Sequence, residues 1–278
     1  MNKYWGVLLF FVFIIHEGFS QQPILTILHT NDTHSQIEPF DINNDKNVGG
    51  VVCRDEVIER ERKSDVPVLL LDAGDFSKGS FYSIFFKGEV EIELMNRMKY
   101  DVVGLGNHEF DDGTAVLVQR LKKAKFEVIC ANYHFANKQL AKIVKPYTII
   151  KRGGLKIGLF GLTIQLNGLV NPNMIKDVQY LDPVTTSQKM VSLLKKKKKC
   201  DLVICLSHLG ISPDDPDNPV ITDSILAASV NGIDIIIGGH NHHLLEQPII
   251  INNTKILQLD YGGIRIGKLS IYKKNDNE

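Results

Sequence analysis

Short apolar segments recur along the chain and are rich in Ile, Val and Leu. They cover residues 24–28, 66–71, 101–105, 126–129, 156–160, 202–206 and 233–237. A strand with one solvated face alternates apolar and polar residues, whereas continuous apolar character indicates a strand buried on both faces. The pattern therefore predicts a sheet that is covered on both sides.

Longer segments with helical character lie between several of these strands. They cover residues 51–63, 90–99, 114–124, 183–199 and 222–231. This alternation of strand and helix predicts an α/β fold. After residue 247 the pattern changes to short apolar segments at 249–251, 256–259 and 264–272, separated by Asn-Asn and Gly-Gly pairs. These predict antiparallel strands that close the sheet.

Composition and charge narrow the class of protein. The chain has 278 residues, of which 44% are hydrophobic, and its 32 basic residues balance its 32 acidic ones. Such balance argues against a surface that neutralises the phosphates of a nucleic-acid polymer, and the apolar content is too high for disorder. The length suits one large α/β domain.

The first twenty residues differ from the rest and predict a secretory signal peptide. A single Lys3 precedes an apolar run over residues 4–15, and the small residues Gly18 and Ser20 precede Gln21. The run is shorter than the roughly 18 to 20 residues that cross a bilayer, which disfavours the alternative of an uncleaved membrane anchor. We expect an exported protein, periplasmic or extracellular, whose mature domain is residues 21–278, without a stable membrane anchor.

Four cysteines occur, and their surroundings favour free thiols over disulfides. Cys130, Cys200 and Cys205 lie within or beside β-branched runs, where a cysteine usually behaves as a small buried hydrophobe, and the fourth is Cys53. No C-x-x-C spacing is present, which excludes a zinc site of that type.

Five of the predicted strands are followed at once by imidazole, carboxylate or carboxamide side chains. The residues that follow them are Asp32 and His34, Asp75, the block Asn107 to Asp111, His208, and the run from His240 to His243. Loops at the carboxyl edge of an α/β sheet converge on one crevice, so we expect these side chains to meet there. A single such residue is commonly a turn or helix cap, but five together are hard to explain as turns.

The types of donor predict a metal site. Imidazole with carboxylate and carboxamide suits Zn, Mn, Fe, Co or Ni, and it suits neither a thiolate site nor an oxygen-only Ca or Mg cage. The candidates are too numerous for one tetrahedral ion. A pair of divalent cations about 3.5 to 4 Å apart, bridged by one carboxylate, would use them all.

In combination these motifs resemble the calcineurin-like, dinuclear metallophosphoesterase superfamily. The resemblance rests on Asp32-x-His34, Gly74-Asp75, Gly106-Asn-His-Glu-Phe-Asp111, His208 in Ser-His-Leu-Gly, and Gly239-His-Asn-His242. The opening Leu28-His-Thr-Asn-Asp32 is similar to the 5′-nucleotidase branch, which also contains UDP-sugar hydrolases and 2′,3′-cyclic phosphodiesterases. The resemblance covers residues 24 to about 272 and implies a four-layer αββα fold, a mixed β-sandwich flanked by helices.

The resemblance also implies a role for each motif residue. One cation would be held by Asp32, His34, Asp75 and His242, and the other by Asp75, Asn107, His208 and His240, so that Asp75 bridges. His108 matches the group that stabilises the transition state, oriented by Asp111. The position of His242 varies within the family. We interpret His29 and His243 as structural neighbours of the site, and Asn132 as a residue that lines it.

The expected activity is hydrolysis of a small phosphate ester, in the first place a nucleotide. Two cations lower the pKa of a shared water towards about 7, and the resulting metal-bound hydroxide attacks the phosphoryl group. Phosphodiester, UDP-sugar or sulfur-ester hydrolysis stays open, whereas a non-enzymatic metal-binding module is disfavoured because no ligand position is lost. Family members usually carry a second, C-terminal domain that binds the nucleobase, and this sequence stops at Glu278 without one. We expect a separate polypeptide to supply it, or else a broad specificity.

Overall fold

A five-stranded sheet forms one half of the molecule. The computed structural model describes residues 22–42, 45–212 and 220–273, and the predicted signal peptide lies outside this part of the chain. In spatial order the strands are β15 (Gly267–Ile271), β1 (Leu25–Thr30), β4 (Val68–Asp72), β5 (Val102–Gly104) and β6 (Glu127–Ile129). Strands β1, β4, β5 and β6 are parallel, and β15 pairs antiparallel with β1 at the edge.

A six-stranded sheet forms the other half. Its order is β13 (Ile249–Ile251), β14 (Thr254–Leu257), β12 (Ile235–Ile237), β11 (Leu202–His208), β9 (Leu155–Thr163) and β8 (Tyr147–Arg152). The four central strands are parallel, and β13 and β8 are antiparallel edges. The prediction that segment 256–259 is an antiparallel strand was therefore wrong in one respect. Strand β14 is antiparallel to β13 but runs parallel to β12, because the chain crosses from β12 through β13 before returning.

The two sheets pack face to face, and their strands are buried on both sides as the sequence predicted. In β4, Leu69 and Leu71 point into the core between the sheets, where they meet residues of the second sheet such as Ile204 and Leu206. The intervening Leu70 points to the opposite face and packs among helical side chains. Each apolar strand therefore contributes to two cores at once.

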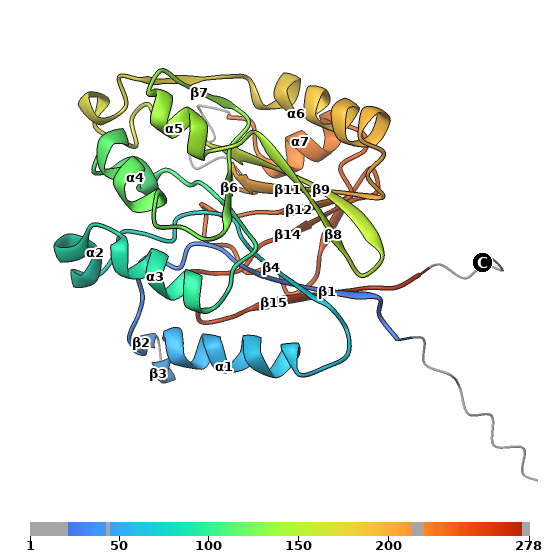
Figure 1. Ribbon diagram of the computed structural model, residues 1–278, viewed down its shortest axis with the longest axis horizontal. Helices are drawn as coiled ribbons and strands as arrows, with labels where there is room; N and C mark the ends of the chain where they lie inside the picture. Colours follow the sequence, from blue (N-terminus) through green and yellow to red (C-terminus); the bar gives the residue numbers. More distant parts are fainter. Residues whose placement is uncertain (1–21, 43–44, 213–219, 274–278) are drawn as a thin grey trace, which may run out of the picture.

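Helices cover the outer face of each sheet and complete the four layers (Figure 1). On the first sheet these are α1 (Val51–Arg62), α3 (Glu89–Arg97), α4 (Thr114–Leu121) and α5 (Lys138–Ile143). On the second sheet they are α6 (Pro183–Val191) and α7 (Asp223–Ser229). Figure 1 shows α6 and α7 on one side of the molecule and α1 on the other. The αββα expectation is confirmed.

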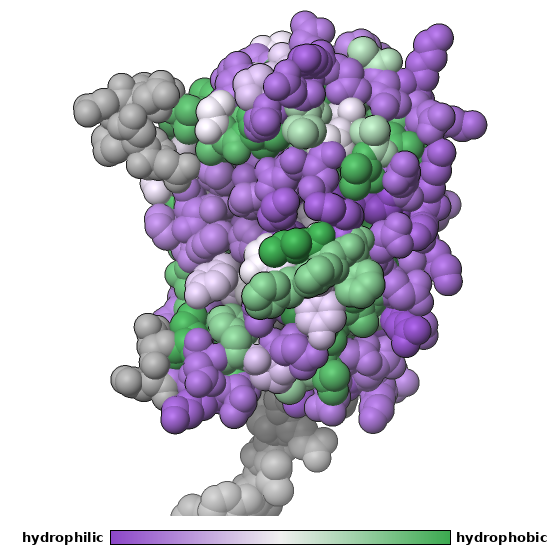
Figure 2. Space-filling view, turned by 90° about the vertical axis from the view of Figure 1, so that its left-hand side faces the viewer, coloured by the Kyte–Doolittle hydropathy of each residue, from purple (hydrophilic) through white to green (hydrophobic). Residues whose placement is uncertain are grey.

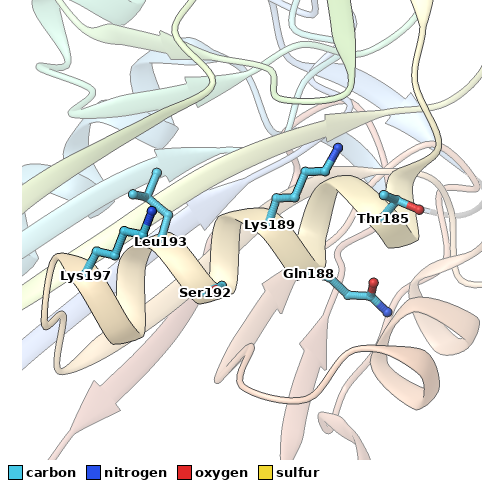
Figure 3. Close-up of a pocket in the computed structure, with 6 residues that line it drawn as sticks. All are labelled: Thr185, Gln188, Lys189, Ser192, Leu193 and Lys197. Atoms are coloured by element: carbon cyan, nitrogen blue, oxygen red, sulfur yellow. The ribbon is translucent and has the colours of Figure 1, made fainter.

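The predicted helix 183–199 is divided in two. It begins as expected, because Asp182 caps the N-terminus and Pro183 occupies its first position. It ends at Val191 and continues as the π-helical turn η3 (Ser192–Lys197), within which Lys195 pairs with Asp234 at 2.6 Å. A surface pocket lies along this helix, lined entirely by residues of α6 and η3 (Figure 3). No candidate metal ligand lines it.

Several short elements were not predicted, because their apolar patterns are too brief to show a period. They are α5 and β8 together with β2 (Phe40–Ile42), β3 (Asp45–Val48), α2 (Phe81–Phe86), η1 (His108–Phe110), β7 (Tyr133–Phe135), η2 (Pro172–Met174) and β10 (Val178–Tyr180). Of these, α2 exposes large apolar side chains. Phe81 is 77% exposed and Phe85 75%, and Figure 2 shows hydrophobic side chains gathered near the middle of the face where α2 lies.

Two further expectations concern cysteines and membrane spans. All four cysteines are free; Cys130, Cys200 and Cys205 are buried and Cys53 is exposed. Across residues 22–42, 45–212 and 220–273, no helix has the length and apolar character needed to span a bilayer.

Candidate metal centre

The predicted ligands come from five strands of both sheets and meet at one edge. Asp32 and His34 follow β1, Asp75 follows β4, and Asn107 follows β5 in the first sheet. In the second sheet His208 is the last residue of β11, and His240 and His242 follow β12. These strands are parallel within their sheets, so their carboxyl ends share an edge, and the stacking of the sheets brings the two edges together.

Most of these side chains leave the strand ends on left-handed backbone. The φ angles are 49° at Asp32, 47° at His34, 55° at Asp75, 81° at His240 and 56° at His242. Residues with a Cβ rarely adopt such angles, and each costs of the order of 1 to 3 kcal/mol. Strain concentrated on one cluster is typical of functional sites, where the rest of the fold holds it in place.

The buried floor of the cluster joins the two sheets through His208 and Asp75. Nδ1 of His208 lies 2.9 Å from the carbonyl oxygen of Ala73, which can only accept, so Nδ1 carries the proton. Nε2 of His208 lies 2.9 Å from Oδ2 of Asp75 and makes no well-formed hydrogen bond. An unprotonated Nε2 and a carboxylate repel each other at this distance, so the pair needs a positive charge, either a proton on Nε2 or a bound cation.

The electrostatics of this pair point the same way. Burial opposes a charge on His208, but the carboxylates of Asp75 and Asp32 outweigh it and raise the pKa of His208 to about 10. Burial likewise opposes ionisation of Asp75, yet His208, His108 and His34 hold the pKa of its carboxyl below the ordinary value. The pocket therefore attracts positive charge between His208 and Asp75, the position that a cation bound by both would take.

A second cluster surrounds Oδ1 of Asp32. This oxygen lies 3.7 Å from Nε2 of His34 and 3.5 Å from Nε2 of His242, and the two Nε2 atoms are 2.9 Å apart. The carbonyl oxygen of Lys78 lies 3.2 Å from Nδ1 of His34, which fixes the proton there and leaves Nε2 as an acceptor. Burial lowers the pKa of His34, so this imidazole is neutral at pH 7.

The two clusters fit divalent cations. Asp32, His34 and His242 each place one donor atom within 4.8 Å of the others, and so do Asp75, His208 and His240. Metal–ligand bonds of about 2.0 to 2.3 Å put the ligand atoms of one ion at comparable separations. His34, Asp75 and His108 satisfy the same limit, so Asp75 lies within reach of both clusters.

Asn107 and His240 link the clusters. Oδ1 of Asn107 lies 3.1 Å from Nδ1 of His240. The backbone N–H of His240 donates to both carboxylate oxygens of Asp32, at 3.2 and 3.0 Å. All seven predicted metal ligands therefore belong to one connected group.

His108 and Asp111 form the predicted pair at the rim. Nδ1 of His108 lies 2.7 Å from Oδ2 of Asp111, and this hydrogen bond raises the pKa of His108 to about 9, against the opposing effect of burial. The side chain of His108 is 38% exposed, whereas that of His208 is fully buried. His108 is thus a cationic group that faces the solvent side of the cluster.

Two glycines allow the backbone to approach these ligands closely. A Cβ on Gly106 would lie 2.1 Å from Oδ1 of Asp75, and one on Gly239 would lie 2.8 Å from both Oδ2 of Asp32 and Nδ1 of His208. Side chains cannot fit at either position without displacing a candidate ligand.

Two buried residues within the motifs had no predicted role and prove to hold the loops. Glu109 accepts hydrogen bonds from the backbone N–H groups of Asp75 and Gly106, and also from Ser77. Asn31 donates to Asp32 and bonds to the backbone of Leu259. Their place inside the motifs was the available signal, but only the folded structure supplies their partners.

Other polar residues near the motifs lie outside the cluster. Asn132 is buried and its amide bonds at both ends to the backbone of Thr163, and the interpretation that it lines the site stays a prediction. His29 is buried beneath Gly267 in the neighbouring strand β15, and burial lowers the pKa of its imidazole to about 4, in agreement with a structural role. His134 and His243 are exposed.

Comparison with known proteins agrees with this geometry. The family model described as calcineurin-like phosphoesterase matches residues 25–244. Human 5′-nucleotidase is 33% identical over 232 residues, which cover 80% of this chain and 38% of that protein. Protein UshA of Yersinia enterocolitica is 30% identical over 245 residues, which cover 85% of this chain and 43% of that protein.

Solved structures give the same result. The crystal structure of the 5′-nucleotidase precursor from Thermus thermophilus superposes on this chain with a TM-score of 0.78 at 32% sequence identity. The match covers 88% of this chain and 50% of the Thermus thermophilus chain. The chain spans half or less of the length of these relatives. From the family match, the shared fold and the clustered His and Asp donors, we conclude that the chain belongs to the calcineurin-like metallophosphoesterase family.

Proposed function

We propose that this chain is a dinuclear-metal phosphohydrolase of the 5′-nucleotidase type that acts on small phosphate monoesters. The observation that carries the proposal is the pair of donor clusters that meet at this edge, each made of one carboxylate and two imidazoles. In this proposal one cation is held by Asp32, His34, Asp75 and His242. The other is held by Asp75, Asn107, His208 and His240.

The chain's own residues would prepare the site for phosphoryl transfer. Two divalent cations, when bound, would activate a water as nucleophile and neutralise charge on the phosphoryl oxygens. Asp32, Asp75 and His208 are buried, so they fix the donor geometry away from bulk solvent. His108 presents positive charge at the exposed rim, where it would donate to a phosphoryl oxygen or protonate the leaving oxygen, while Asp111 orients its ring.

The substrate class rests on similarity and is the part that needs an assay. Relatives at about 30% identity are named as 5′-nucleotidases, which supports nucleoside monophosphates as substrates. We would measure hydrolysis of AMP, UDP-glucose, 2′,3′-cyclic AMP and bis-p-nitrophenyl phosphate with added Mn or Zn, together with metal content. Preference for AMP supports the proposal. Preference for the cyclic or diester substrates assigns a phosphodiesterase, and metal binding without hydrolysis assigns a non-enzymatic module.

We further propose that a separate polypeptide contributes a nucleotide-binding domain. One observation supports this: α2 presents exposed Phe81, Ile84, Phe85 and Phe86, an apolar surface that a partner domain would cover. Helix α2 lies beside the metal centre, since Ser80 at its start donates to the carbonyl oxygen of Ser35, next to His34. Full, selective nucleotidase activity from a lone monomer would contradict this proposal.

Export is proposed on the character of residues 1–20. Protein isolated from the periplasm or medium of expressing cells should begin at Gln21. A protein that retains residues 1–20 and stays in the cytoplasm would contradict it.

A further inference from the structure

The turn that carries two candidate ligands is strained and needs support from outside itself. Within residues 239–243, His240 has a φ of 81° and His242 a φ of 56°. Such angles persist only where surrounding contacts hold them. The support of His240 is visible, because Asp32 accepts from its backbone N–H and Asn107 meets its ring. His242 differs, since its side chain is 39% exposed, and its ring meets the ring of His34, itself a candidate ligand, and stacks against Tyr261 with centroids 5.2 Å apart.

Gln258 is placed to hold this turn. It directly follows β14, and only 1% of its surface is exposed. With its amide oriented to complement its neighbours, Oε1 accepts from the backbone N–H groups of His242, at 3.3 Å, and His243, at 3.0 Å. Its Nε2 donates to the carbonyl oxygen of Gly239 at 3.2 Å. One buried side chain therefore bonds to both ends of the strained turn.

The backbone around Gln258 closes the same loop. The N–H of Leu245 donates to the carbonyl oxygen of Gln258 at 3.0 Å, and the N–H of Gly238 donates to that of Leu257 at 2.7 Å. The segment between β12 and β13 is thus fixed to the end of β14 both before and after the candidate ligands His240 and His242. Such residues, which orient the ligands without touching the metal, typically change metal affinity by roughly 10- to 100-fold when replaced.

We propose that Gln258 is a positioning residue that sets the orientation of His242 and so controls affinity at the Asp32–His34–His242 cluster. Affinity at the Asp75–His208–His240 cluster depends on it much less, because His240 has its own contacts to Asp32 and Asn107. This inference rests on the proposed two-cation site.

The test compares Gln258→Met, which keeps the length of the side chain and removes both polar groups, with Thr254→Val. Thr254 is equally buried at the start of β14, and its hydroxyl donates to the carbonyl oxygen of Ile233, away from the turn. Binding of Co²⁺ to the metal-free chain would be followed by equilibrium dialysis and visible absorption. Hydrogen exchange of residues 239–245 would be measured in parallel.

The expected result is two Co²⁺ per chain in the wild type and in Thr254→Val. In Gln258→Met we expect one dissociation constant raised roughly 10- to 100-fold, the other unchanged, and faster exchange at His242 and His243. Both constants within twofold of wild type would overturn the inference, whereas fewer than two Co²⁺ in the wild type would overturn the proposed function itself. If Gln258→Met does not fold, Gln258→Asn, one methylene too short to reach both ends, serves with the same expectations.

Discussion

The carboxylate of Glu109 accepts a hydrogen bond from the backbone N–H of Asp75 at 2.9 Å, although the two residues follow different strands. The same carboxylate accepts from Gly106 at 2.7 Å and from both the N–H and hydroxyl of Ser77. Burial and the charge of Asp75 raise the pKa of Glu109, and the charge of Arg120 partly offsets this rise. Glu109 thereby fixes the loops after β4 and β5 to each other, and these loops carry the residue that both proposed cations share.

Replacing Glu109 with Gln should destabilise the protein and misplace Asp75. The amide NH₂ would face backbone donors, so at least one buried group loses its partner, at a cost of about 1 to 3 kcal/mol in the free energy of unfolding. Urea denaturation measures this cost. The control is Glu93→Gln on α3, where the side chain is 58% exposed and should change stability by less than about 0.5 kcal/mol. If the two variants are equally stable, Glu109 does not hold the loops after β4 and β5 together.

Gly106→Ala should impair catalysis more than folding. Its Cβ would lie 2.1 Å from Oδ1 and 2.7 Å from the backbone N of Asp75, so the carboxylate and its loop must move, and a displacement of about 1 Å can cost roughly 10²-fold in rate. Gly104→Ala in β5 is the matched control, because the nearest atom to its Cβ, at 3.4 Å, is in ordinary contact. Steady-state kinetics of both variants decide the matter. The explanation fails if Gly106→Ala retains wild-type kcat/KM.

His108→Ala should lower kcat by about 10²- to 10⁴-fold while leaving two metals bound, since its ring acts at the exposed rim. Metal analysis and kinetics on the same preparation test both halves of this statement. His134→Ala, at an exposed position of β7, should change neither. Loss of a metal from His108→Ala would instead place His108 among the ligands, as its proximity to His34 and Asp75 allows.

Asp111→Asn should lower the pKa of His108 from about 9. The hydrogen bond from Nδ1 to the Asp111 carboxylate is the largest contribution to that raised value, and a neutral amide stabilises the imidazolium far less. NMR titration of the His108 ring in the metal-free protein measures the change. A pKa that stays near 9 in the variant would assign the shift to the nearby carboxylates of Asp75 and Glu109 instead.

Chelation of the metals should abolish hydrolysis and lower the melting temperature. Without cations only a proton can supply positive charge between His208 and the Asp75 carboxylate, which lie 2.9 Å apart, and a ligand that binds only the folded state at roughly 100 times its Kd stabilises that state by about 2.7 kcal/mol. Thermal denaturation with EDTA, and again after adding back Mn or Zn, measures the difference. If neither EDTA nor added Mn or Zn changes the melting temperature, no metal binds at this position.

Much of the architecture could be predicted from local pattern alone. Leu69, Leu70 and Leu71 are consecutive, and such a run is stable in a strand only if both faces are covered, which already implies helices and a second layer. The donors could be predicted for a similar reason. Asp32, Asp75 and His208 each lie at or just beyond the end of a buried strand, and parallel strands present their carboxyl ends at one edge.

What the pattern could not reveal depends on contacts between distant parts of the chain. His208 bonds to Ala73, 135 residues away, and this contact between the sheets fixes the tautomer that makes Nε2 a ligand. Contacts between distant parts of the chain also produce the parallel pairing of β14, the left-handed backbone at His242, and the hydrogen bonds of Glu109 and Gln258. The sequence by itself determined the layers and the donor types, because burial and side-chain chemistry are local properties. Only the tertiary structure decided which donors face one another, since hydrogen-bond partners and backbone strain are set when the sheets pack.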